Sequence, residues 1–127
     1  MKSVIALGLL ACSGLVNAAP VTVSFEGYSS AIKNDNVKVI STGEKQFFTV
    51  SIDFEKCIMT NGEEVTEGTH CDKGTFVSMS SEMIGVIPYV SQTWIYERPN
   101  GAFIYTWQVA HGWQTSVFRG DSYKVVR

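Results

Sequence analysis

Polar and apolar residues alternate most regularly between residues 48 and 55. Phe48, Val50, Ile52 and Phe54 are separated by single polar residues. A period of two places successive side chains on opposite faces of an extended chain. This segment therefore predicts a strand that is buried on one face only.

The segment before it has another spacing. Phe25, Tyr28 and Ile32 follow at intervals of three and four residues, which is typical of one helical face. Gly27 disfavours a helix by roughly 1 kcal/mol relative to alanine, and the start of the segment is also compatible with a strand. We expect a short helix that ends near residues 34–36.

Turn residues divide the rest of the chain into short β-compatible runs. The clearest turn is Arg98–Gly101, because Pro99 fixes φ and both Asn100 and Gly101 tolerate positive φ. Pro88 favours an edge or a bulge in its run. We expect strands over residues 37–40, 75–79, 83–90, 92–97, 102–109, 113–118 and 123–126. We expect turns at residues 42–45, 61–62, 67–68, 73–74, 98–101 and 119–121. Residues 60–70 are expected to form a mobile acidic loop.

These elements predict one mainly β domain of the α+β type. We expect a small antiparallel sheet or sandwich with one short N-terminal helix. The chain has no internal repeat, low-complexity stretch or linker that would divide it. Residues 20–127 therefore form a single predicted β-rich domain.

The N-terminus is typical of a secretory signal. Lys2 precedes an apolar run from Val4 to Leu10, and Val16-Asn17-Ala18 has the spacing of a signal peptidase site. The run is shorter than the roughly 18 apolar residues needed to cross a bilayer. We expect residues 1–19 to be a signal peptide and the protein to be secreted, or periplasmic in a bacterium. The alternative is a lipobox that ends at Cys12, which would tether the chain by a lipid.

The cysteines fit export. Loss of Cys12 with the signal leaves Cys57 and Cys71 as one pair in an oxidising compartment. We expect them to form a disulfide, which for a loop of about 15 residues stabilises by roughly 3 kcal/mol. A zinc site needs further ligands at close spacing, and only His70 is adjacent, so we expect no zinc.

Charge excludes one class of partner. The chain has a net charge of -2, which becomes -3 without Lys2, and it has no Lys/Arg-rich stretch. We therefore expect no nucleic-acid partner. The acidic loop offers oxygen ligands to calcium, although its spacing is not that of an EF-hand. The weak calcium candidates are Glu63, Glu64, Glu67 and Asp72; we expect no other metal and no cofactor.

Aromatic residues are dense in the second half of the chain. Alternation requires that about half of them fill the core. Rings that remain on the surface often mark contact sites for sugars, peptides or proteins. The candidate binding residues are Trp94, Tyr96, Tyr105, Trp107 and Trp113.

Catalysis has little support. The chain has neither a Gly-x-Ser-x-Gly motif nor a free cysteine once the pair is bridged. The two histidines, His70 and His111, both lie beside turn residues. A glycosidase with paired carboxylates needs a deep cleft, for which a chain of this size has little room. We therefore expect no enzyme activity and no catalytic residues.

The segment Phe48 to Cys57, FTVSIDFEKC, resembles the strand motif of the VirK family of small exported bacterial proteins. SFEGYSSAIKNDNVKV is similar to that family's helix and following strand, and WIYERPNGAFIYTWQV to its late aromatic hairpin. Cys71 departs from the pattern, because the family's second cysteine lies near the C-terminus. The family has no established catalytic residues, so the resemblance implies export and fold rather than activity.

We expect a secreted, non-enzymatic protein that acts by binding, as an extracellular binding or matrix-associated component. The partner is a protein, a glycan or a mineral, and no membrane span is expected. The alternatives are a periplasmic accessory or inhibitor protein of a bacterium, or a small hydrolase.

Overall fold

A computed structural model describes residues 19–33 and 38–127. In these residues nine antiparallel strands form one sheet, and no helix is present. Residues 1–18 of the predicted signal peptide, including Cys12, lie outside the described residues. The strands are β1 (Val21–Lys33), β2 (Lys38–Asp53), β3 (Ile58–Asn61), β4 (Glu64–Glu67), β5 (His70–Asp72), β6 (Thr75–Ile84), β7 (Ile87–Glu97), β8 (Phe103–His111) and β9 (Gln114–Val126).

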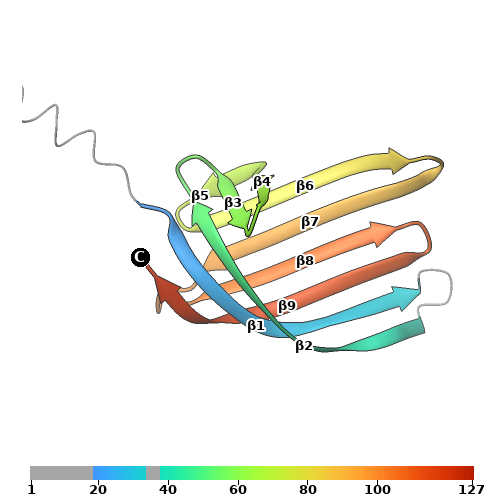
Figure 1. Ribbon diagram of the computed structural model, residues 1–127, viewed down its shortest axis with the longest axis horizontal. Helices are drawn as coiled ribbons and strands as arrows, with labels where there is room; N and C mark the ends of the chain where they lie inside the picture. Colours follow the sequence, from blue (N-terminus) through green and yellow to red (C-terminus); the bar gives the residue numbers. More distant parts are fainter. Residues whose placement is uncertain (1–18, 34–37) are drawn as a thin grey trace, which may run out of the picture.

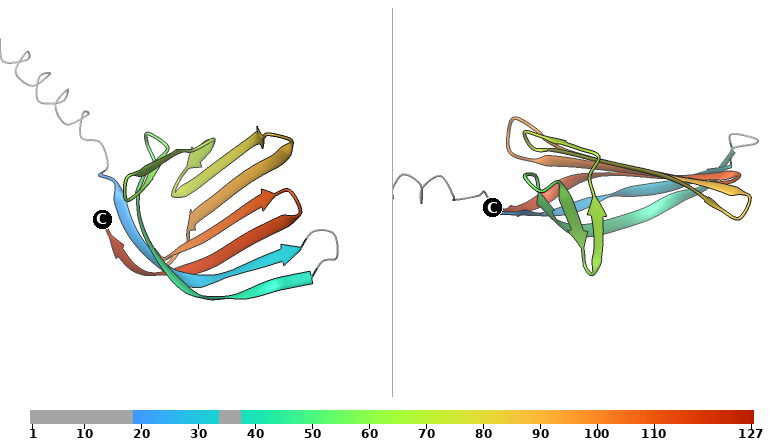
Figure 2. Two further views of the ribbon diagram at one scale, coloured as in Figure 1. Left: turned by 45° about the vertical axis from the view of Figure 1, so that its right-hand side comes forward. Right: turned by 90° about the horizontal axis from the view of Figure 1, so that it is seen from above.

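The sheet curls into a half-barrel (Figures 1 and 2). Its strand order is β4-β3-β2-β1-β9-β8-β7-β6-β5. The two outermost strands, β4 and β5, are consecutive in the chain. The connection between them therefore joins the two edges of the sheet, and the curl has an inner and an outer face. The expected antiparallel β architecture is confirmed as a single curled sheet rather than a sandwich.

The hydrophobic core lies on the inner face, at the end of the half-barrel where β3 and β5 begin. Alternation on each long strand directs one set of apolar side chains inward. The core is rich in phenylalanine and β-branched residues, which favour the pleated geometry. Its fully buried members include Val23, Phe25, Val50, Ile52, Phe76, Ile95, Phe103 and Phe118.

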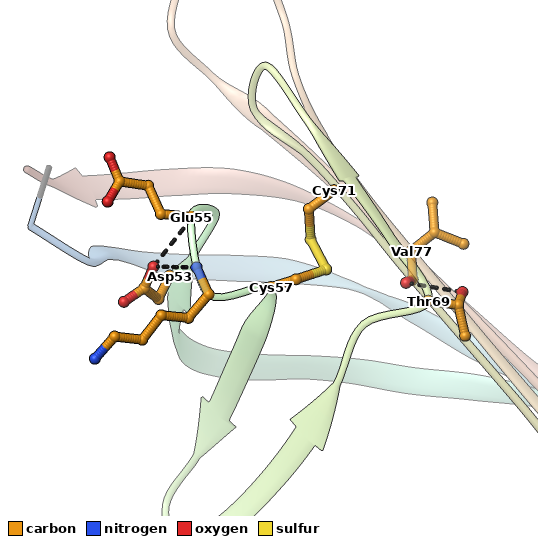
Figure 3. The surroundings of a disulfide bond; sticks show 7 residues. Asp53, Glu55, Cys57, Thr69, Cys71 and Val77 are labelled. Carbon is orange, nitrogen blue, oxygen red and sulfur yellow. Dashed lines mark hydrogen bonds between the residues drawn. A yellow bond between two sulfur atoms is a disulfide. The ribbon is translucent and has the colours of Figure 1, made fainter. Parts of the chain in front are cut away.

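The predicted disulfide between Cys57 and Cys71 is present, with the two Cα atoms 5.6 Å apart (Figure 3). Cys57 directly precedes β3, near one edge of the sheet, and Cys71 lies in β5 at the other. The Gly68 N–H donates to the Cys57 carbonyl at 2.8 Å, and the Thr69 N–H donates to the Val77 carbonyl at 2.7 Å. The first hydrogen bond extends the β3–β4 pair and the second extends the β5–β6 pair, so the edges are joined at this end by the disulfide and by the short Gly68–Thr69 connection that these bonds anchor.

The predicted N-terminal helix is wrong, because residues 21–33 form strand β1. Val21, Val23 and Phe25 alternate inward and pair with β2, for example Phe25 with Phe48. The helical spacing of Phe25, Tyr28 and Ile32 arises beside irregularities in strand pairing, where β-bulges shift the alternation. Pairing on both sides of β1 outweighs this local pattern.

Two predicted turns lie inside continuous strands. Residues 42–45 belong to β2, and Arg119-Gly120-Asp121 belongs to β9. A side chain at Gly120 would collide with the Phe118 ring, whose nearest atom lies 2.6 Å from where a Cβ would stand. Gly120 therefore leaves room for the Phe118 ring of the same extended strand and does not mark a turn.

Other boundaries also move. The predicted strand over residues 83–90 contains the β6–β7 turn, where Gly85 has φ 65°. Pro88 lies at the start of β7, an interior strand, where it pairs with Met83. The acidic segment 60–70 is not an unstructured loop, because it holds most of the β3–β4 hairpin and the start of β5.

The remaining strand and turn predictions are largely confirmed. β2 contains the alternating segment predicted from residue 48, and Val50 and Ile52 are buried. It ends at Asp53, whose carboxylate accepts hydrogen bonds from the N–H groups of Glu55 and Lys56. The β7–β8 hairpin turns at residues 98–101 as predicted, and the Arg98 N–H donates to the Ala102 carbonyl.

Candidate functional site

A cleft of about 690 Å³ lies on the inner face, between the β3–β4 hairpin and strands β6, β7 and β8. Its volume is within the range of roughly 300–1,000 Å³ that is usual for small-molecule sites. We call it the inner cleft. It is lined by Phe48, Met59, Asn61, Glu64, Val65, Thr66, Glu67, Ser78, Met79, Ser80, Tyr89, Ser91, Thr93, Tyr105, Trp107 and Val109.

The floor of the inner cleft is aromatic. Tyr105 and Trp107 point inward from β8, and Phe48 approaches from β2. Phe118 supports all three, with ring centroids 5.0 Å from Phe48, 5.6 Å from Tyr105 and 6.3 Å from Trp107. Offset and edge-to-face pairs of this kind hold rings in fixed orientations. Trp107 is only partly buried, so part of its ring is left to the cleft.

One wall of the inner cleft carries hydroxyl groups in two cross-strand rows. Ser78 pairs with Thr93, which pairs on its other side with Trp107. The second row joins Ser80 to Ser91 on the neighbouring strand. Each row shares a face because directly opposed residues of an antiparallel pair point the same way. Hydroxyl donors and acceptors therefore line the approach to the aromatic floor.

Charge in the inner cleft has one sign. Glu64 and Glu67 line it from β4, and no Lys, Arg or His is among its described lining residues. Burial raises the pKa of Tyr105 to about 12; the hydrogen bond with Thr93 opposes this shift, and the negative charge of Glu64 adds to it. The phenol therefore remains neutral at physiological pH. The electrostatics disfavour an anionic ligand.

The raised pKa of Tyr105 predicts that the protein loses stability in alkaline solution. The unfolded chain, with a tyrosine pKa of 10.0, releases this proton before the folded chain does, so the stabilisation is complete below pH 10 and is lost as pH rises towards 12. Between pH 9 and pH 11 we expect the free energy of unfolding to fall by about 1 kcal/mol from this group. Urea unfolding at a series of pH values measures it.

Two variants separate this effect from the titration of other groups. Tyr105→Phe removes the phenol and should flatten the alkaline slope. Tyr123→Phe is the matched control, because Tyr123 is exposed on β9, and its slope should equal that of the wild type. Equal slopes in all three proteins would contradict the role of Tyr105.

The five predicted binding aromatics do not form one site. Tyr105 and Trp107 line the inner cleft, whereas Trp94 and Tyr96 point to the outer face and are 45% and 42% exposed. Trp94 pairs with Thr106 and Tyr96 with Ile104, so the register assigns them to the opposite side of the sheet from Tyr105. Trp113 lies in the β8–β9 turn.

The four predicted calcium candidates are also divided. Glu64 and Glu67 line the inner cleft, Glu63 lies in the β3–β4 turn, and Asp72 is exposed on β5. Within residues 19–33 and 38–127, no three His, Cys, Asp or Glu side chains are close enough together to hold a metal ion. Glu64 and Glu67 are therefore the two candidates that contribute charge to the inner cleft.

Sequence reasoning missed the hydroxyl wall and Phe48 as site residues. A signal was present, because Ser78 and Ser80 alternate with larger residues, as do Ser91 and Thr93. This alternation predicts that each pair shares a face. It does not indicate that the two faces meet across neighbouring strands, which depends on the register of β6 and β7.

Comparison with protein-family models, curated proteins and solved structures found no match for this chain. The similarity to the VirK family therefore stays a prediction. Residues 19–33 and 38–127 contain no helix that is long and apolar enough to cross a membrane.

Proposed function

We propose that this is an exported, non-enzymatic protein that binds a neutral glycan segment in the inner cleft. The observation that carries the proposal is an aromatic floor beside rows of uncharged hydroxyls in a cleft of ligand-binding size. A sugar ring has an apolar C–H face and a rim of hydroxyl groups. The first matches the ring of Trp107, and the second matches Ser80, Ser91 and the carboxylate of Glu64.

The charge of the cleft supports a neutral ligand over an acidic one. The only charged lining residues described are Glu64 and Glu67, which would repel phosphate, sulfate or uronate groups. The same carboxylates accept hydrogen bonds from sugar hydroxyls strongly, because charge-assisted hydrogen bonds are about twice as strong as neutral ones. Neutral oligosaccharides are therefore the ligand class that we propose.

Export is consistent with this activity. The disulfide between Cys57 and Cys71 is typical of proteins in an oxidising compartment. A neutral glycan outside the cell is commonly part of an insoluble wall or matrix. A matrix-associated binding protein therefore fits the proposal better than a hydrolase or an inhibitor.

Removal of the Trp107 ring is expected to weaken glycan binding by about tenfold or more, since central buried aromatics carry much of the binding energy at such sites. Calorimetry with neutral cello-, xylo-, chito- and malto-oligosaccharides measures the dissociation constant for the wild type and for Trp107→Ala.

Trp94→Ala is the matched control, because Trp94 lies on the outer face and should leave binding unchanged. Glu64→Gln provides a second test at the rim that does not disturb the aromatic packing. Absence of binding by every oligosaccharide, or equal losses in the two tryptophan variants, would contradict the proposal.

A further inference from the structure

The β6–β7 turn exposes a cluster of aliphatic side chains. Val86 at its apex is 89% exposed, and Met83 is 62% exposed; Ile84 and Ile87 are also exposed. We call residues 83–88 the apolar tip. Figure 1 shows this turn at the end of the long β6–β7 hairpin that lies away from β3 and β5, the strands beside the disulfide. The tip contributes nothing to the buried core, so its apolar character needs another explanation.

The tip is apolar on both sides of the hairpin. Met83 pairs with Pro88, and Ile84 pairs with Ile87. Neighbouring pairs on a hairpin point to opposite faces, so aliphatic groups project in both directions as well as from the apex. A protein that docks on one face would leave the other face wet. A hydrocarbon layer surrounds an inserted tip on all sides, which fits this geometry.

The β8–β9 turn lies at the same end of the half-barrel (Figure 1), and Trp113 is one of its residues. The Gly112 N–H donates to the Pro88 carbonyl at 3.1 Å, which fastens this turn to the start of β7. Trp113 is 58% exposed, and the Lys33 ammonium lies 5.8 Å from the centroid of its ring. Tryptophan and lysine are suited to the headgroup level of a bilayer, where one end of each side chain is apolar and the other wet.

We propose that the apolar tip inserts into the surface of a zwitterionic phospholipid bilayer, with Trp113 and Lys33 at the headgroup level. The segment 83–90 carries no charged residue, and Glu82 precedes it. Insertion therefore needs no desolvation of charge within the tip. Among the described residues of the tip and the adjoining β8–β9 turn there is no Lys or Arg, and Lys33 is the ammonium that lies beside Trp113; this charge pattern favours a zwitterionic surface over one that requires a polybasic patch. This is contact with one leaflet, and it is independent of the inner cleft.

The experiment measures co-sedimentation with phosphatidylcholine vesicles. It uses the protein secreted by its expression host. Mass spectrometry determines the N-terminus, because the apolar residues 4–10 would themselves bind vesicles if they were retained. We expect the wild type to bind, and Val86→Asp to weaken partition by at least about tenfold, because a charge replaces a lipid-buried aliphatic group. Brominated lipids should quench the tryptophan fluorescence of the wild type more than that of Trp113→Phe.

Val126→Asp is the matched control, since Val126 is a half-exposed valine near the C-terminus, away from the tip. Its partition should equal that of the wild type. Circular dichroism verifies that each variant is folded. Absence of vesicle binding, or equal binding by wild type and Val86→Asp, would overturn the proposal. So would a dimer that forms without lipid and dissociates on Val86→Asp, because the tip would then be covered by a second copy.

Discussion

Phe118→Ala is expected to lower the free energy of unfolding by about 4 kcal/mol. Truncation of a buried phenylalanine removes its hydrophobic burial and leaves a cavity, and together these typically cost 3–5 kcal/mol. Phe118 is fully buried and its ring packs against Phe48, Tyr105 and Trp107. Urea unfolding followed by tryptophan fluorescence measures the loss. It is a large part of the roughly 5–15 kcal/mol that stabilises a typical domain.

Tyr123→Ala on the same strand is the control. Tyr123 is exposed and has one described ring neighbour, Phe47, at 6.1 Å, so we expect a loss below about 1 kcal/mol. Similar losses in the two variants would mean that Phe118 is not central to the core. If Phe118→Ala remains folded, its weaker support of Trp107 should also reduce glycan binding.

Removal of the disulfide is the second large effect. Cys57→Ser/Cys71→Ser should destabilise the protein by roughly 3 kcal/mol, because the bridge restricts the unfolded chain over a sequence separation of 14 residues. For a domain of this size, such a loss lowers Tm by roughly 10–20 °C. Thermal unfolding by circular dichroism measures it. The bridge also joins the two sheet edges, so its loss should increase hydrogen exchange in β3, β4 and β5.

Reduction of the wild type is the matched comparison. A reducing agent should lower the stability of the wild type to that of the double serine variant and leave the variant itself unchanged. A loss below about 1 kcal/mol would show that the Gly68–Thr69 connection, anchored by its two hydrogen bonds, suffices to hold the edges together.

Local chemistry in the sequence was sufficient to predict several features. The alternation from Phe48 to Ile52 predicted a strand because period two has one simple explanation. The residues Pro99, Asn100 and Gly101 predicted the β7–β8 turn because few other conformations suit them. The two cysteines predicted their own disulfide because no other partner remained after the signal. Each of these inferences depends on residues close in sequence or on a small set of alternatives.

Register and curvature were decided only by the tertiary structure. Residues 25–32 have a helical spacing, but pairing with β2 and β9 makes them a strand. Gly120 has the appearance of a turn residue, yet the Phe118 ring needs the space above it.

The division of the aromatics has the same origin. Alternation separates the two faces of each strand, but it does not say which face lies on the concave side of the sheet. Spacing alone therefore cannot show whether Trp94 or Tyr105 points inward. The cross-strand register places Tyr105 and Trp107 inside with the serines, and Trp94 and Tyr96 outside. The site therefore exists because long-range pairing brings four strands and the β3–β4 hairpin around one space, which no local pattern encodes.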